Sequence, residues 1–590
     1  MIQTEKLSFG FGEKNLYSDI SFTLEEGQHC ALIGSNGTGK STLVEMLINP
    51  EEYLYDGKIT IDENCRIGYA GQFSVHDKFT DQTVFEYLSE RFTRLSREIE
   101  AVCAEMAQAE DPSALFEKYQ ELLDRNEAMD GDNYENNIRR NLAAAGMAEL
   151  EETKLAQISG GEYKVLQIMR EMLLSPTLLI LDEPDVFLDF ANLGSLCRMI
   201  NSYKGTMLVV THNRYLLNHC FDKVLHLENG DLQEFDGSYT EYRCSILREK
   251  LALKIQNIEE QDEIARTQEM VDILRKRASE KVNPVIGRSV NAKQSQLDRL
   301  LARQIKAPFI EIREPKIVLP EASWDDVHTP ENTAAETPAD RVVLEIKDYR
   351  AAFDDELLQN VNLQLKAGEK AALVGANGTG KTTLVRDILR NDNPAIHIDE
   401  NIKYACLSQL REEGLDEEKT VCEIMQDVGF VKRDDIKEYL KQYCLQEECM
   451  NRKAGQLSGG EKNLLQIALI AVSGAQLLIL DEPTSHLDIY AQTALEKAVA
   501  EYKGAVLMVT HDFYLAAGCA DFVLLMENNT LRRMRTRKFR KMVYDRYFDS
   551  AYLETDRRRQ ELEAEITNAF RDNNLAAADK LCTQLEALSS

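Results

Sequence analysis

The sequence lacks any apolar run close to the roughly 20 residues that a membrane-spanning helix needs. Its most apolar stretches, residues 477–480 and 506–509, are only a few residues long. Residues 1–6 also lack the basic and then apolar pattern of a secretory signal. We therefore expect a cytoplasmic protein that does not enter the membrane.

Paired cysteines are missing as well. The 12 cysteines are scattered singly, and the nearest two, Cys444 and Cys449, have no second pair to accompany them. Zinc sites and disulfide frameworks need such pairs, so neither is expected. The thiols should be reduced and mostly buried.

Basic residues are scarce, with 69 Lys and Arg against 100 Asp and Glu and a formal charge of −31. This charge argues against binding of nucleic acid by the whole surface, and it makes any local basic patch stand out. A chain of 590 residues, of which 44% are hydrophobic, is folded but too long for one core. We expect several domains.

Two glycine-rich segments match the phosphate-loop pattern G-x-x-x-x-G-K-[ST]. Residues 34–41 read Gly-Ser-Asn-Gly-Thr-Gly-Lys-Ser, and residues 375–382 read Gly-Ala-Asn-Gly-Thr-Gly-Lys-Thr. In this pattern backbone N–H groups surround phosphate oxygens, the lysine reaches the outer phosphates and the hydroxyl binds Mg²⁺. The predicted ATP-binding residues of the two loops are Gly34, Asn36, Gly37, Gly39, Lys40, Ser41 and Thr42, and Gly375, Asn377, Gly378, Gly380, Lys381, Thr382 and Thr383.

The chain repeats more than these loops. After each loop come Ile-Asp-Glu-Asn, a glutamine, Ser-Gly-Gly-Glu, an apolar run that ends in Asp-Glu-Pro, and Thr-His, in the same order. From the serine onward the halves keep a constant offset of 299 positions, as between Ser159 and Ser458. We interpret the halves as duplicated domains.

Two helical additions interrupt the repeat. The first half has about 38 extra residues, within 86–141, whose composition predicts a protruding helical hairpin. Residues 240–306 contain Gly and Pro only at 283–287, and apolar residues recur at helical spacing on both sides. We expect a helix of up to about 40 residues, roughly 60 Å long, then a tip loop and a shorter returning helix.

These motifs, in this order and twice, resemble the ATP-binding cassette (ABC) family. The long helical linker, the inserted arm and the lack of a membrane domain resemble its ABC-F branch of ribosome-associated ATPases. The resemblance implies an α/β fold with two P-loop ABC ATPase domains in tandem, joined by a long α-helical hairpin linker. We place the first nucleotide-binding domain at 1–240, the linker at 241–320 with a basic tip at about 279–292, a flexible connector at 321–340, the second nucleotide-binding domain at 341–545 and short C-terminal helices at 546–590.

Carboxylates end the apolar runs of both halves. Asp182 and Asp481 would lie near an Mg²⁺ ion that the hydroxyls of Ser41 and Thr382 also bind. A glutamine after a strand-like run in each half could sense this ion and the attacking water. The resemblance implies ATP and Mg²⁺ as cofactors, and the predicted metal-site residues are Ser41, Gln72, Asp182, Thr382, Gln409 and Asp481.

Catalytic roles follow from the neighbouring residues. Glu183 and Glu482 are placed to orient or deprotonate the water that attacks the γ-phosphate. His212 and His511 could donate a hydrogen bond to the γ-phosphate. A histidine after a strand is usually a core or surface residue, but the repeated order favours the functional interpretation.

Ser-Gly-Gly-Glu alone is a plausible helix N-cap. In the ABC family this signature caps the nucleotide held by the opposite domain, which suits a helix N-terminus that faces an anion. The resemblance thus implies two composite sites, in which Ser458, Gly459 and Gly460 face the first loop and Ser159, Gly160 and Gly161 face the second. Phe11 and Phe353 precede the loops and could stack on adenine or belong to the strand core.

The halves differ after Asp-Glu-Pro. Residues 484–488, Thr-Ser-His-Leu-Asp, are close to the usual family run, whereas residues 185–189 read Asp-Val-Phe-Leu-Asp. Asp189 and Asp488 preserve the carboxylate of this loop between the domains. Two sites of unequal activity and neutral drift at a loop both explain the difference.

The linker concentrates positive charge. Residues 275–306 include nine basic and two acidic residues. Such a segment favours a phosphate backbone and a steep salt dependence of binding, although it could also be a basic coiled-coil face. Residues 532–541 form a second basic cluster, which could equally be a solvated strand edge. The predicted RNA-binding residues of the linker are Arg277, Lys281, Arg288, Lys293 and Arg299.

The resemblance to ABC-F proteins also implies partners. It implies a monomer whose two cassettes pair with each other, bind the ribosome near the tRNA exit site, and act through the linker on the peptidyl-transfer centre, rRNA and P-site tRNA. In that family this serves translation or protection against antibiotics. The alternative is a soluble tandem ATPase subunit that energises a separate membrane transporter.

Overall fold

The structure is a computed structural model that describes residues 2–11, 14–62, 64–71, 81–109, 111, 113–280, 292–299, 314–322, 324, 340–352, 356–407 and 415–588. The chain forms two compact units. The larger unit is Met1–Glu234 with Arg313–Leu553, and the smaller unit is Phe235–Ile312 with Glu554–Ser590. Of the predicted residues, Gln72, Lys281, Arg288, Phe353 and Gln409 lie outside the described residues.

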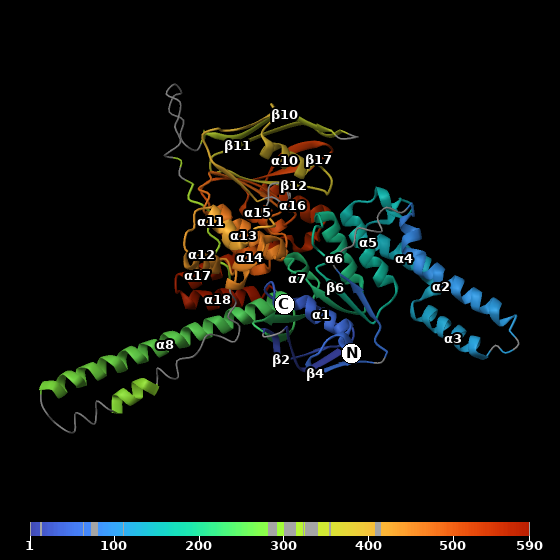
Figure 1. The fold of residues 1–590 in the computed structure, drawn as a ribbon, viewed down its shortest axis with the longest axis horizontal. Helices are drawn as coiled ribbons and strands as arrows, with labels where there is room; N and C mark the ends of the chain where they lie inside the picture. Colours follow the sequence, from blue (N-terminus) through green and yellow to red (C-terminus); the bar gives the residue numbers. More distant parts are fainter. Residues whose placement is uncertain are drawn as a thin grey trace. The chain divides into compact units, whose positions relative to one another are not determined.

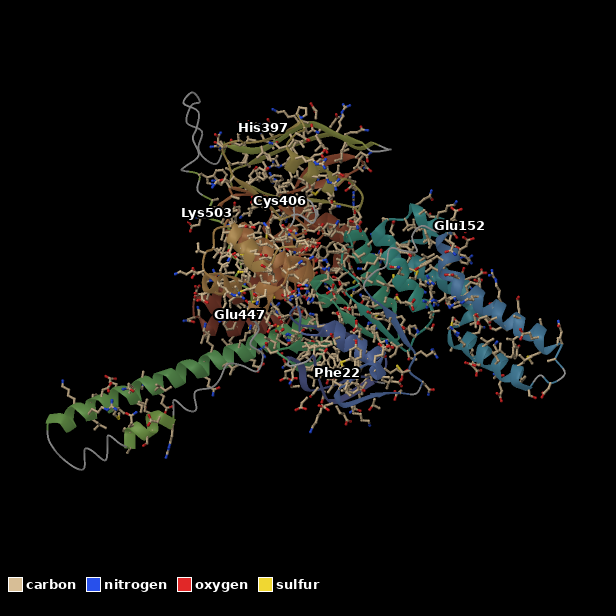
Figure 2. The ribbon with its side chains drawn as sticks, viewed as in Figure 1. Phe22, Glu152, His397, Cys406, Glu447 and Lys503 are labelled. Atoms are coloured by element: carbon tan, nitrogen blue, oxygen red, sulfur yellow. The ribbon has the colours of Figure 1, made fainter. Side chains whose placement is uncertain are left out.

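The first half of the larger unit contains two sheets. A three-stranded antiparallel sheet has the order β2-β1-β4, and a six-stranded, mainly parallel sheet has the order β5-β6-β7-β3-β8-β9. Phe22, on β2, is one of the buried side chains of the core between them (Figure 2). The strands are β1 (Ile2–Phe11), β2 (Lys14–Leu24), β3 (His29–Ile33), β4 (Asp56–Ile61), β5 (Ile67–Ala70), β6 (Leu178–Asp182), β7 (Thr206–Val210), β8 (Lys223–Glu228) and β9 (Asp231–Asp236).

The second half repeats this topology. Its sheets have the orders β11-β10-β13 and β14-β15-β16-β12-β17-β18, which match the first half strand for strand. The prediction of two tandem α/β domains is therefore confirmed. The strands are β10 (Val342–Ala352), β11 (Glu356–Lys366), β12 (Lys370–Gly375), β13 (Ile396–Ile398), β14 (Tyr404–Leu407), β15 (Leu477–Asp481), β16 (Ala505–Val509), β17 (Phe522–Glu527) and β18 (Thr530–Arg535).

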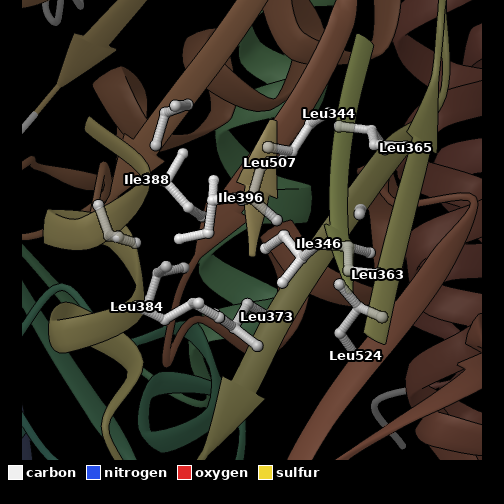
Figure 3. Packing of buried hydrophobic residues seen from close by; sticks show 14 of the residues in the cluster. Leu344, Ile346, Leu363, Leu365, Leu373, Leu384, Ile388, Ile396, Leu507 and Leu524 are labelled. Carbon is white, nitrogen blue, oxygen red and sulfur yellow. The ribbon is translucent and has the colours of Figure 1, made fainter. Parts of the chain in front are cut away.

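The core of each half explains why the strands read as unbroken apolar runs. Strands β15 and β16 are buried at every residue because both faces of the parallel sheet are covered. On one face, Leu373 and Leu507 pack with Leu384 and Ile388 of α10 (Lys381–Arg390), and the small sheet adds Leu344 (Figure 3). This packing fixes the edge of the sheet from which the phosphate loop departs.

Helices of the larger unit flank the sheets (Figure 1). In the first half, α5 carries the signature and α6 follows the residues after Asp-Glu-Pro, with Asp189 as its N-cap, and α13 and α14 are their counterparts in the second half. The helices are α1 (Lys40–Ile48), α5 (Gly160–Leu173), α6 (Phe190–Ser202), α7 (Arg214–His219), α11 (Val421–Asp427), α12 (Arg433–Gln442), α13 (Gly459–Ala471), α14 (Ile489–Glu501), α15 (Phe513–Cys519) and α16 (Thr536–Arg546).

The insertion in the first half is a helical arm. Helices α2 (Val84–Met106) and α3 (Ser113–Ala128) run side by side, and α4 (Tyr134–Ala145) follows (Figure 1). A capping box at Thr83 starts α2. The arm contacts the first half, where Arg91 of α2 forms a 2.8 Å ion pair with Glu171 of α5 and Arg170 of α5 lies over the Tyr87 ring of α2.

The smaller unit is helical. Its main element is α8 (Tyr239–Glu280), whose 42 residues correspond to about 63 Å, and residues 292–299 form a further helix (Figure 1). Helices α17 (Leu553–Arg571) and α18 (Leu575–Glu586) pack against the start of α8, where Cys244, Leu562 and Cys582 are buried. Among the described residues, no helix is long and apolar enough to cross a membrane.

Candidate nucleotide sites

The first phosphate loop joins β3 to α1 in a conformation that needs glycine. Gly34 and Gly39 have φ angles of 152° and 95°. A Cβ at Gly34 would also lie 2.1 Å from the carbonyl oxygen of Leu227, so no side chain fits. The loop therefore presents its backbone N–H groups at the N-terminus of α1, where an anion binds favourably. The second loop joins β12 to α10 in the same way.

The loop lysines are buried and bonded to their own loops. Lys40 Nζ donates to the carbonyl oxygens of Gly34 and Ser35, both at 2.9 Å, and Lys381 does the same at Gly375 and Ala376. Burial lowers the pKa of Lys40 and of Lys381, while nearby carboxylates oppose that shift. A bound phosphate would give each ammonium a stronger acceptor than a backbone carbonyl.

Asp182 ends β6 inside the first site. Burial raises its pKa, and a hydrogen bond with Ser41 opposes this shift. Its Oδ1 is buried and has no hydrogen-bond partner in the described part of the chain. Burial likewise raises the pKa of Asp481 to about 6. A carboxylate oxygen without a partner beside a hydroxyl suits a divalent cation, so Ser41 and Asp182 fit the predicted Mg²⁺.

The predicted general bases lie directly after these carboxylates. Glu183 and Glu482 have φ angles of 48° and 49°, and their N–H groups donate to Val210 and Val509 at 2.9 Å. A left-handed backbone is costly for glutamate, so this turn is held by the ends of β7 and β16. The turn places each carboxyl at the edge of its sheet, next to the phosphate loop. Burial raises the pKa of Glu482 to about 8.

The predicted histidine is buried in the first site, as His212, and mostly buried in the second, as His511. Neither ring nitrogen of His212 has a hydrogen-bond partner among the residues that the structure describes. Burial lowers its pKa well below the ordinary value, and lowers that of His511 to about 3. Both imidazoles are therefore neutral and keep one N–H, which can donate to a phosphate oxygen.

Each signature starts a helix and meets the opposite half. Ser159 and Ser458 are N-caps with complete capping boxes, so the structural interpretation of these serines is also correct. Gly460 lies against the first phosphate loop, since a Cβ there would be 2.3 Å from Nδ2 of Asn36. A Cβ at Gly161 would likewise lie 3.4 Å from Nδ2 of Asn377, in the second phosphate loop. The structure thus brings together the residues of both composite sites.

The residues after Asp-Glu-Pro complete the contact between the halves. Asp488 Oδ2 accepts from the N–H of Asn36 at 3.0 Å, and Asp189 Oδ2 accepts from that of Asn377 at 3.1 Å. Between the two sites, a cavity of about 90 Å³ is lined by residues of both halves. They include Glu183, Phe187, His212, Glu482, His486 and His511.

The unusual Asp185 has a partner that the second half lacks. Asp185 accepts from the Thr211 hydroxyl at 2.6 Å, and burial raises its pKa while the charge of Lys164 opposes the shift. Lys164 donates to the carbonyl oxygen of Val186 at 2.8 Å, and burial lowers its pKa to about 8. The second half has Asn463 in place of Lys164, with hydrogen bonds to the same loop. Lys164 and Asp185 of the first half therefore replace Asn463 and Thr484 of the second half as a matched pair.

Side-chain contacts also join the halves beside the sites. Phe548 stacks on Tyr215 at 3.8 Å, and Phe190 packs against Phe539 at 5.8 Å. Arg214, the neighbour of Tyr215, forms a two-point ion pair with Glu496. Aromatic and charged contacts therefore both join the halves.

Adenine stacking has one described candidate. Phe11 is 62% exposed at the end of β1, and its ring meets Phe9 edge-to-face at 5.0 Å. Because the ring is exposed, it can stack on adenine and does not belong to the strand core, the other interpretation of the sequence. The sequence motifs did not point to Lys164, His226, Glu228 and Tyr490. Three of them differ in residue type from their counterparts in the other half, and the fourth, Glu228, contacts Ser35, which differs from its own counterpart. A residue-by-residue comparison of the halves could therefore have found all four.

Comparisons with known proteins agree with this geometry. The sequence profile of the family described as ABC transporter matches residues 17–186 and 358–485, which together are half of the chain. The chain belongs to the ABC family. Its relatives over most of its length are ABC-F proteins, so the predicted ABC-F membership is confirmed. As an ABC protein it binds ATP and hydrolyses it.

Two relatives and one solved structure illustrate the match. ABC transporter F family member 2 of Arabidopsis thaliana is 29% identical, over 87% of this ABC-F chain and 74% of that protein. The energy-dependent translational throttle protein EttA of Escherichia coli K12 is 26% identical, over 87% and 89%. The archaeal ribosome recycling factor aABCE1, solved with a stalk protein, has a TM-score of 0.55 at 17% identity over 92% of each chain, and shares the fold.

Proposed function

We propose that this ABC-F chain is a ribosome-associated ATPase whose two halves close on ATP and open after hydrolysis. One observation carries the proposal: each phosphate loop contacts the signature glycine and the aspartate of the opposite half of the same chain. Bound ATP would therefore lie between the halves and favour the closed arrangement. The relative EttA, named for an energy-dependent effect on translation, supports the ribosome as the partner.

Hydrolysis would use the residues already described. Lys40 and Lys381 would bind the outer phosphates, and the neutral histidines would hold the γ-phosphate by an N–H donor. Glu183 and Glu482 would orient the water and accept its proton. When bound, Mg²⁺ neutralises charge on the phosphate oxygens. The signature helices would add a positive helix end from the opposite half.

On the ribosome, we propose that the closed halves bind near the tRNA exit site. The linker would then extend toward the peptidyl-transfer centre and contact rRNA and P-site tRNA. The length of α8 and the exposed Arg299 on the following helix support this role. Protection against antibiotics and regulation of translation are the two outcomes that such a position allows.

A basic strip on the larger unit supports contact with RNA. Strand β18 is at the edge of its sheet, and α16 follows it directly. Seven basic side chains of these two elements are exposed on a chain with a net charge of −31, and two of them, Arg533 and Arg546, form ion pairs with Glu369 and Glu527. The other five form the basic strip: Arg532, Arg535, Arg537, Lys538 and Lys541. Each phosphate that they neutralise would steepen the salt dependence of binding.

A purified translation reaction tests the proposal. The double variant Glu183→Gln, Glu482→Gln should bind ATP without hydrolysing it and should stop peptide synthesis at stoichiometric amounts. Reversal of three charges of the basic strip, as in Arg535→Glu, Arg537→Glu and Lys538→Glu, should relieve this inhibition. Translation that proceeds normally with the ATP-bound double variant would contradict the proposal and favour a subunit that energises a membrane transporter.

A further inference from the structure

The first phosphate loop has a second connection to the opposite half. Its direct connection is made by Asn36, which donates to Asp488 and to the carbonyl oxygen of His486. The second connection begins at Ser35. Its N–H and its hydroxyl both donate to Oε2 of Glu228, at 2.9 and 2.8 Å. Glu228 is the buried last residue of β8, so it holds the loop from the sheet.

Two further residues extend this connection to the second half. His226, on the same strand, is only 1% exposed, and its Nε2 lies 3.7 Å from Oε2 of Glu228. The same nitrogen lies 3.2 Å from the hydroxyl of Tyr490, at the start of α14 in the second half. At the other end, the carbonyl oxygen of Ser35 accepts from Lys40 at 2.9 Å. A continuous polar path thus joins Tyr490 to the phosphate-binding lysine.

The carboxylate in this path is held in its charged form. Burial alone would raise the pKa of Glu228, but the nearby imidazole of His226 and the hydrogen bonds from Ser35 lower it overall. Oε2 of the ionised carboxylate accepts both donors of Ser35, and its negative charge strengthens both hydrogen bonds. The path therefore holds two groups of the loop, the N–H and the hydroxyl of Ser35.

Among the residues that the structure describes, the second site has no equivalent path. At the corresponding positions it has Ala376, Leu525 and Ala191, none of which carries a polar side chain. The counterpart of Glu228 is Glu527, and its carboxylate accepts from Arg546 at 2.9 Å instead. The direct contact through Asn377 is retained. Both phosphate loops therefore keep the direct connection to the opposite half, and they differ in the indirect one.

We propose that Tyr490, His226 and Glu228 are positioning residues of the first site, which fix Ser35 and make the shape of this phosphate loop depend on contact with the second half. The first site would then bind ATP well only when the halves meet, whereas the second loop holds its shape without such help. As ATP is added, the second site would fill at lower concentrations than the first, which binds ATP together with closure of the halves. The inference concerns the ATPase alone and stands or falls separately from the ribosomal proposal.

ATP binding by single-site variants tests this inference. In a Lys381→Ala background only the first loop binds ATP, and Tyr490→Phe should there weaken binding about two- to tenfold, the effect of one lost hydrogen bond. Ser35→Ala, which introduces the alanine found at this position of the second loop, should weaken ATP binding by the same factor. The two substitutions together should weaken it no further, because they interrupt one path.

Two controls separate positioning from a loss of folding. In a Lys40→Ala background only the second loop binds ATP, and Tyr490→Phe should leave that binding unchanged. Glu527→Gln should leave ATP binding unchanged in both backgrounds, because Glu527 contacts no phosphate loop in the described structure. Equal weakening of both sites by Tyr490→Phe, or multiplied effects in the double variant, would overturn the inference. So would unchanged binding by Tyr490→Phe at an unchanged melting temperature.

Discussion

Replacement of Gly194 by alanine tests the contact between the halves, because two effects on stability oppose each other. Gly194 lies within α6, where alanine stabilises a helix by about 1 kcal/mol relative to glycine. A Cβ at this position, however, would lie 2.0 Å from the carbonyl oxygen of Tyr547 in the second half. That distance is far shorter than any real contact, so the segment that carries Tyr547 must move.

The cost of this movement follows from what the segment holds. Overpacking of this kind costs about 1–3 kcal/mol. The shift would also weaken the stack of Phe548 on Tyr215, worth about 0.5–1.5 kcal/mol. The hydrogen bond from Arg198 to Tyr547, at 3.3 Å, adds about 0.5–1.5 kcal/mol. After subtraction of the helical gain, we expect Gly194→Ala to destabilise the protein by about 1–5 kcal/mol.

Thermal unfolding decides the sign. We expect the first transition to fall by roughly 2–4 °C per kcal/mol, the shift typical of a domain of this size. Gly518→Ala is the matched control, since Gly518 lies in α15 and a Cβ there would meet nothing within 4 Å. It should leave stability unchanged or raise it slightly. If Gly194→Ala stabilises the protein as Gly518→Ala does, the halves do not meet as described.

Three further outcomes are expected. Lys164→Asn should lower the melting temperature, because it leaves Asp185 without its positive neighbour. Adding Asp185→Thr should restore the melting temperature, since the double variant then has both residues of the second half. A double variant no more stable than Lys164→Asn alone would contradict the pairing. Gly460→Ala should lower ATP turnover at least tenfold, because its Cβ would lie 2.3 Å from Nδ2 of Asn36 and 2.7 Å from the carbonyl oxygen of His486, and normal turnover would contradict the composite site. Glu183→Gln together with Glu482→Gln should leave ATP binding intact while slowing hydrolysis by about 10²-fold or more, as measured by phosphate release, whereas a loss of binding would contradict their role as bases.

The repeated motifs predicted much of this molecule because each is local. A phosphate loop needs glycines, a lysine and a hydroxyl at fixed spacing, so the sequence alone places both loops between strand and helix. Contacts between the halves obey no such spacing. Gly194 looks like a glycine that merely weakens a helix, and only the structure shows Tyr547 against it. The departure at Asp185 was visible in the sequence, but its compensation by Lys164, 21 positions earlier, required the fold.

The most direct test of the account is cosedimentation with ribosomes of the Glu183→Gln, Glu482→Gln variant, in ATP and in ADP. We predict that it pellets with ribosomes in ATP and stays in the supernatant in ADP, since only ATP holds the halves closed. Adding Arg288→Ala and Lys293→Ala in the linker should leave pelleting largely intact but relieve the inhibition of translation. An ATP-bound variant that never pellets with ribosomes, even at low salt, would contradict the account.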